Sequence, residues 1–255
     1  MLMFNILHKS GILTKLYSYA SNYEGTANEL AGCINDQKDL VEKLEISHTL
    51  LTGTECDKLN VKDLWFEALG RWQKDCVHPI IQISGHGTRG KDPHGREDDG
   101  YCEGQYLDSG EVLWDFELWN DILSKFPVEA LLRVIADICH SDGQQRIKGT
   151  QKKRFVDNLS TPYMYKETPN IRKRSTSLNY AWLSACREDE TAADATFKGR
   201  ANGAMTYYFL KNYRKDDSFF KDYKRAKKKI NRLVRFSQHL VMSGNPKIYN
   251  LPLVI

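Results

Sequence analysis

The sequence predicts an α/β fold in which helices cover both faces of a mainly parallel sheet. Short apolar segments alternate along the chain with longer segments whose apolar residues recur at helical spacing, as in consecutive βα units. The chain has 255 residues, of which 41% are hydrophobic and 27% are charged. That length and composition allow a sizeable buried core and exclude a fibrous or disordered protein. We expect a single domain over residues 1–255.

The elements expected in chain order are short strands and longer helices. Strands are expected over residues 12–20, 46–51, 78–83, 131–138 and 180–185, and residues 249–255 are expected to close the sheet. Helices are expected over residues 28–44, 61–74, 112–126, 203–213 and 218–240. The first strand is more polar than a buried strand usually is. Residues 142–178 are basic and lack apolar periodicity, so they predict a long loop.

Composition also limits the class of protein. The six cysteines are scattered without a CxxC pair, which favours a reduced, cytoplasmic protein and gives no spacing for a zinc site. No segment approaches the roughly 18 consecutive apolar residues of a membrane span, and the first residues lack the pattern of a signal peptide. The net charge is +4, with basic residues concentrated after residue 146. We interpret these as solvated surfaces on a monomer rather than a nucleic-acid interface, because no recognition motif accompanies them.

Two residues with complementary chemistry follow predicted strands. His86 comes directly after strand 78–83, and Cys139 comes directly after strand 131–138. The carboxyl ends of parallel strands form the binding edge of such a sheet, so both side chains are expected there. An imidazole beside a thiol makes a base and a nucleophile, and the backbone N–H groups of Gly87 and Cys139 are the natural donors to an oxyanion. Taken singly, a strand-end cysteine is more often simply buried, and a Gly-His-Gly segment is more often only a turn.

The motifs around these two residues resemble those of metacaspases and their bacterial relatives. Residues 84–88 (SGHGT) with 97–101 (EDDGY) resemble the histidine block, and residues 137–141 (DICHS) resemble the nucleophile block. Flanking segments 28–36, 184–195 and 203–206 agree in order. The separation of His86 and Cys139 is 139 − 86 = 53 residues, close to the roughly 50 typical of caspases. The resemblance implies a caspase-like three-layer α/β/α sandwich with a His86/Cys139 dyad.

The resemblance also implies a primary specificity pocket lined by Cys33, Asp36, Ser84 and Asp137. Asp137 stands two positions before Cys139, so on a strand it shares that residue's face. Two carboxylates would bind a substrate Lys or Arg and repel Asp, and metacaspases cleave after Arg or Lys. Simpler interpretations are a surface charge for Asp36 and a satisfied strand-end polar group for Asp137. We therefore expect a cysteine endopeptidase that cleaves after Arg or Lys through an acyl-enzyme; the alternative is a caspase-like pseudoenzyme or scaffold that binds partners.

Two features of the family remain open in this sequence. Metacaspases often bind calcium through aspartates after the histidine block and beyond the nucleophile. Here one expected position offers only Asp115, and Arg146 stands seven residues past Cys139. We therefore expect that the chemistry requires no cofactor and that calcium activation is doubtful. If the enzyme cleaves after basic residues, the loop offers five candidate self-processing sites, namely Arg146, Lys148, Arg154, Arg172 and Arg174; the simpler interpretation is a solvated loop.

Overall fold

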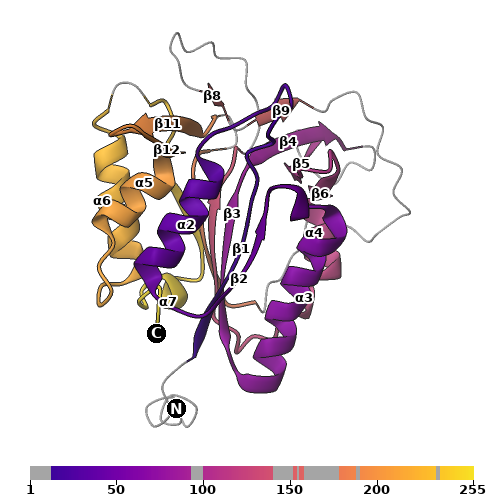
Figure 1. The fold of residues 1–255 in the computed structure, drawn as a ribbon. Coiled ribbons are helices and arrows are strands. Elements are labelled where there is room, and N and C mark those ends of the chain that lie inside the picture. Colours follow the sequence, from indigo (N-terminus) through magenta and orange to yellow (C-terminus); the bar gives the residue numbers. More distant parts are fainter. Residues whose placement is uncertain are drawn as a thin grey trace.

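The structure is a computed structural model that describes residues 13–92, 100–139, 152–153, 155–157, 178–187, 190–233 and 236–255 (Figure 1). Within this part of the chain the central sheet has six strands in the order β13-β10-β7-β3-β1-β2. Their bounds are β1 (Thr14–Ala20), β2 (His48–Thr52), β3 (His78–Ser84), β7 (Leu132–Asp137), β10 (Tyr180–Ser184) and β13 (Val241–Gly244). Every neighbouring pair is parallel except β10 with β13. The predicted mainly parallel sheet is confirmed.

Helices cover both faces of this sheet. One face carries α2 (Cys33–Leu44), α5 (Ala204–Asn212) and α6 (Phe219–Ile230), and the other carries α3 (Lys58–Asp75) and α4 (Asp115–Asp121) (Figure 1). Alternate residues of β7 serve the two faces: Ile135 packs in the core that includes α2, α5 and α6, whereas Val134 and Ala136 pack in the core that includes α3 and α4. This arrangement is the expected three-layer sandwich.

Two smaller sheets flank the central one. The first has the order β6-β5-β4-β9, and the second has the order β12-β11-β8. Their bounds are β4 (His86–Lys91), β5 (Tyr101–Tyr106), β6 (Val112–Trp114), β8 (Lys152–Lys153), β9 (Phe155–Asp157), β11 (Ala193–Phe197) and β12 (Arg200–Gly203). The remaining short elements are η1 (Gly53–Glu55), η2 (Leu123–Lys125) and α7 (Pro246–Tyr249). Both smaller sheets lie toward the carboxyl ends of the central strands (Figure 1).

Several expected boundaries differ from the structure for local reasons. Strand β1 is buried despite its polar sequence, because Tyr17 and Tyr19 pack their rings among the apolar side chains of α3. Helix α2 begins at Cys33 rather than at residue 28. The backbone N–H groups at its start are bound by the side chains of Asn22 and Asp194, so the preceding residues form a loop.

From residue 112 onward, the observed elements differ more strongly from the expected ones. The helix expected over 112–126 starts as strand β6, is α-helical only over Asp115–Asp121 and ends in the short 3-10 helix η2. The helix expected over 218–240 ends at Ile230. The prediction that residues 249–255 close the sheet is wrong, because β13 occupies that edge beside β10 and residues 246–249 form α7. Within the loop expected over 142–178, residues 152–153 and 155–157 form the short strands β8 and β9.

Two further properties of the described residues concern membranes and disulfide bonds. In the part of the chain that the structure describes, no helix combines the length and the apolar character needed to cross a membrane. All six cysteines belong to that part, and each is a free thiol rather than half of a disulfide.

Candidate active site

His86 is the first residue of β4, and the loop that follows β1 holds it from two sides. Its imidazole Nε2 lies 2.6 Å from the carbonyl oxygen of Asn28, and its backbone N–H donates to the hydroxyl of Tyr23 over 2.9 Å. A carbonyl oxygen only accepts hydrogen bonds, so Nε2 carries the proton in the neutral ring. Nδ1 is then the ring nitrogen without a proton, so its lone pair can take one, as a general base must. His86 is only 3% exposed.

Cys139 follows the last residue of β7 after one intervening position. Its thiol is buried in the apolar cluster between the sheet and α5, and its sulfur lies 3.0 Å from the backbone nitrogen of Ala192. An N–H directed at the sulfur stabilises negative charge there, and a thiolate is the reactive form of a cysteine.

The sheet brings the two segments together. Ser84, at the end of β3, pairs directly with Asp137, at the end of β7. Beyond these ends, a β-carbon added to Gly87 would lie 1.6 Å from the carbonyl oxygen of Cys139. Only glycine allows this approach. Gly87 therefore contacts the backbone of Cys139. This contact joins the chain segment that carries His86 to the segment that carries the thiol.

Asp36 lies beside this junction and is fully buried. Its carboxylate accepts hydrogen bonds from the hydroxyl of Ser84 over 2.8 Å, the side-chain amide of Asn202 over 3.1 Å and the N–H of Gly203 over 2.9 Å. These three donors come from the end of β3 and from the last two residues of β12, so they fix the orientation of the carboxylate. The interpretation of Asp36 as a surface charge is therefore wrong.

Asp137, the last residue of β7, lies at the same junction and is also fully buried. One carboxylate oxygen accepts from both the N–H and the hydroxyl of Thr206, over 2.9 and 2.8 Å, at the start of α5. A β-carbon on Gly203 would lie 2.2 Å from that oxygen and 2.8 Å from the nearer oxygen of Asp36. Both acids therefore contact the same glycine, where β12 passes into α5. Cys33, at the start of α2, is fully buried in a small neighbouring cluster with Tyr23.

Comparisons with known proteins show the family of this chain. A profile of the caspase domain family of peptidases, Peptidase_C14, matches residues 20–252. The chain belongs to the caspase domain family. Its relatives include Metacaspase-1 of Schizosaccharomyces pombe, which is 27% identical over 74% of this chain and 57% of its own length. Metacaspase-1 of Cryptococcus neoformans is 28% identical over 74% of this chain and 53% of its own length. This chain thus spans little more than half the length of these curated relatives.

Solved structures show the same fold. Protein GSU0716 of Geobacter sulfurreducens superposes with a TM-score of 0.69 at 19% identity, covering 95% of this chain and 98% of its own. The Drosophila initiator caspase Dronc superposes with a TM-score of 0.61 at 11% identity, covering 94% of this chain and 82% of its own. The caspase-like fold expected from the motifs is confirmed.

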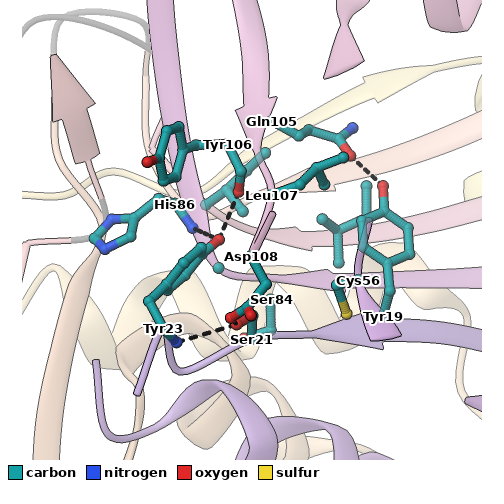
Figure 2. Close-up of a pocket in the computed structure, with 13 residues that line it drawn as sticks. Tyr19, Ser21, Tyr23, Cys56, Ser84, His86, Gln105, Tyr106, Leu107 and Asp108 are labelled. Carbon is teal, nitrogen blue, oxygen red and sulfur yellow. Dashed lines mark hydrogen bonds between the residues drawn. The ribbon is translucent and has the colours of Figure 1, made fainter. Parts of the chain in front are cut away.

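A small cavity lies next to His86 in this caspase domain. Its lining includes Tyr19, Ser21, Tyr23, Cys56 and Gln105 (Figure 2). At about 10 Å³ it is near the smallest space that holds one water molecule. It is therefore too small to receive a substrate side chain, and burial raises the pKa of the Cys56 thiol to about 12, which makes that cysteine unreactive.

Residues that sequence reasoning did not single out complete the site. Tyr23, Ala192, Asn202 and Thr206 each contact one of the predicted residues across a long sequence separation. The carbonyl oxygen of Asn28 does the same for His86. Backbone groups and capping hydroxyls leave no local pattern. Asn28, Ala192 and Thr206 lie inside the matching motifs, which is the one signal that could have indicated them, whereas Tyr23 and Asn202 lie outside those motifs.

Some predicted positions lie outside the described residues. These are the five candidate self-processing sites, Arg146, Lys148, Arg154, Arg172 and Arg174, and the acidic residues Glu97, Asp98 and Asp99. Among the residues that are described, no group of three or more His, Cys, Asp or Glu side chains is placed to hold a metal ion. The expectation that calcium activation is doubtful stays a prediction, and the steps proposed below run through the chain's own side chains.

Proposed function

We propose that this chain is a cysteine endopeptidase that cleaves polypeptides after Arg or Lys. The main support is the junction at Gly87, which joins His86 and Cys139 at adjacent strand ends of a caspase domain. Nδ1 of His86 takes the thiol proton, and the sulfur attacks the scissile carbonyl carbon to form a C–S bond. The same imidazole then protonates the leaving amine as the C–N bond breaks, which leaves a thioester on Cys139.

Water completes the cycle. His86 takes a proton from a water molecule, whose oxygen attacks the thioester carbon to form a C–O bond. The C–S bond then breaks, the acid product leaves, and the imidazolium returns its proton to the sulfur of Cys139. The Asn28 carbonyl oxygen accepts from Nε2–H throughout, so it holds the ring in one orientation and stabilises the imidazolium. We propose the N–H groups of Gly87 and Cys139 as donors to the oxyanion that forms on the scissile carbonyl.

The preference for Arg or Lys is proposed from the two buried acids. Asp36 and Asp137 are both fully buried, and both contact Gly203 beside the end of β7. Two carboxylates at the base of a pocket attract a guanidinium or ammonium group and repel a substrate Asp. Ser84 and Cys33 would form its remaining wall.

The specificity is tested by neutralising each acid. Asp36→Asn and Asp137→Asn keep the shape of the side chain and remove its charge. We expect each to lower kcat/KM for a peptide with Arg before the cleaved bond by at least tenfold. Asp39→Asn, one turn along α2, is the matched control, because Asp39 accepts from Asn202 and pairs with Arg200 at the surface. Equal losses in all three variants would contradict the proposed pocket.

Self-processing after the basic loop residues is proposed on the same specificity. Purified wild-type protein and Cys139→Ala are incubated side by side, and fragments are identified by mass spectrometry. We expect new termini after one or more of Arg146, Lys148, Arg154, Arg172 and Arg174 in the wild type alone. The same fragments in Cys139→Ala would show that another protease makes them.

A cytoplasmic location and a monomeric state of the protein stay predictions.

A further inference from the structure

We propose that Tyr23 is a positioning residue for His86, a role that rests on the proposed function of His86 as the base. The Tyr23 hydroxyl accepts a hydrogen bond from the backbone N–H of His86 over 2.9 Å and donates one to the carbonyl oxygen of Tyr106 over 2.6 Å. The Tyr23 ring also lies against the imidazole, with 4.7 Å between the ring centroids. Figure 2 shows this hydroxyl between the two strands, with dashed lines to both partners.

The hydroxyl occupies a defined place in the smaller sheet. His86 and Tyr106 face each other across β4 and β5, and the Tyr23 hydroxyl bridges these two facing residues. It therefore fixes the backbone at the first residue of β4, where the direction of the His86 side chain is set. The loop that carries Tyr23 also supplies the Asn28 carbonyl, so one segment holds both the backbone and the ring of His86.

Tyr23 adopts a backbone conformation that a tyrosine rarely takes. Its φ angle is +53°, in the left-handed region that favours glycine. Three hydrogen bonds hold it there: its N–H donates to the Ser21 hydroxyl, and its carbonyl oxygen accepts from the N–H and the hydroxyl of Thr26. Such a conformation persists only where its surroundings impose it, and it concentrates at functional sites.

Burial keeps the Tyr23 hydroxyl in one chemical form. The residue is only 4% exposed, and burial raises its pKa well above the usual value for tyrosine. The phenol therefore keeps its proton at neutral pH, so it has one proton to donate and lone pairs to accept with. The hydroxyl can thus bridge His86 and Tyr106 as the structure shows.

The test compares Tyr23→Phe with Tyr19→Phe. Tyr19 is equally buried, and its hydroxyl bonds to the Gln105 side chain rather than to His86 (Figure 2). Both variants remove one buried hydroxyl, so a purely structural role predicts similar effects. We expect Tyr23→Phe to lower kcat about tenfold with KM unchanged and to speed hydrogen exchange at the His86 amide. Tyr19→Phe should do neither, and equal kcat values in the two variants would overturn the inference.

Two further variants keep the result interpretable. In Gly85→Ala the new β-carbon would lie 2.6 Å from the Tyr23 hydroxyl, so it displaces that group while the tyrosine remains. We expect the same loss of kcat, which covers the case in which Tyr23→Phe fails to fold. His86→Ala separates the two proposals: if it hydrolyses peptide at the wild-type rate, the proposed function fails. If His86→Ala is inactive and Tyr23→Phe is fully active, only the positioning role fails.

Discussion

Gly87 is the residue at which the two halves of the site touch. A β-carbon there would lie 1.6 Å from the carbonyl oxygen and 2.6 Å from the carbonyl carbon of Cys139, and both are backbone atoms that cannot rotate away. We expect Gly87→Ala to separate β4 from Cys139, to lower the free energy of unfolding by about 1–3 kcal/mol and to abolish hydrolysis. Urea unfolding and a peptide assay measure the two effects.

Gly70 provides the control for that substitution. It lies inside α3 with no atom within 4 Å of an added β-carbon. Alanine is a better helix former than glycine, so Gly70→Ala should raise the free energy of unfolding by about 0.5–1 kcal/mol and leave hydrolysis unchanged. A Gly87→Ala protein as stable and active as Gly70→Ala would show that the junction tolerates a side chain.

His78, at the start of β3, predicts a pH dependence of stability. Burial lowers its pKa to about 4, and the nearby buried Arg133 adds to the effect. Between pH 6.5 and 4 the unfolded chain binds a proton here that the folded chain does not. The free energy of unfolding should therefore fall as the pH drops through that range, by up to about 3 kcal/mol.

His78→Asn isolates this contribution. The amide oxygen can replace Nδ1 as acceptor for the N–H of Leu131, and asparagine does not titrate. Urea unfolding at pH 7 and pH 4.5 should show a smaller loss of stability in the variant than in the wild type. Parallel curves for the two proteins would contradict the assignment.

At the scale of elements, the start of α2 depends on a residue far along the chain. Asp194, on β11, accepts hydrogen bonds from the N–H groups of Ala31 and Gly32 over 2.8 and 3.3 Å. A carboxylate at a helix N-terminus satisfies unpaired donors and is stabilised by the helix dipole. We expect Asp194→Ala to lower the free energy of unfolding by about 1–2 kcal/mol. Asp194→Asn keeps an acceptor oxygen, so thermal unfolding should show a clearly smaller loss for it.

The elements that the sequence predicts best are those with strong local patterns. The apolar segments became β3, β7 and β10, and the helical spacing of residues 61–74 became α3. Strands β4 and β5 were not predicted, because HGTRGK and YCEGQY lack regular alternation of apolar and polar residues. The sequence does contain a signal for the hairpin formed by β11 and β12, at its turn. Lys198 and Gly199 both have positive φ angles, as in a two-residue hairpin turn, and Gly199 marks it in the sequence.

At the scale of the whole molecule, topology explains which site residues could be predicted. His86, Cys139 and Asp137 follow or end predicted strands, so the parallel sheet alone places them at one edge. Asp36 needed the resemblance to the family, because its own helix gives no sign that it faces inward. Tyr23 and the Asn28 carbonyl could not be predicted from local pattern, because they act on His86 across 63 and 58 residues of chain.

Peptide hydrolysis by the wild type, His86→Ala and Cys139→Ala decides whether this chain is a peptidase that acts through His86 and Cys139. Fluorogenic peptides with Arg, Lys or Asp before the reporter group are assayed with and without calcium, at equal concentrations of folded protein. We expect the wild type to cleave the Arg and Lys peptides and both variants to be inactive. Cleavage of the Asp peptide alone would contradict the acidic pocket. Equal rates in the wild type and Cys139→Ala, or no cleavage by any of them, would contradict the peptidase itself.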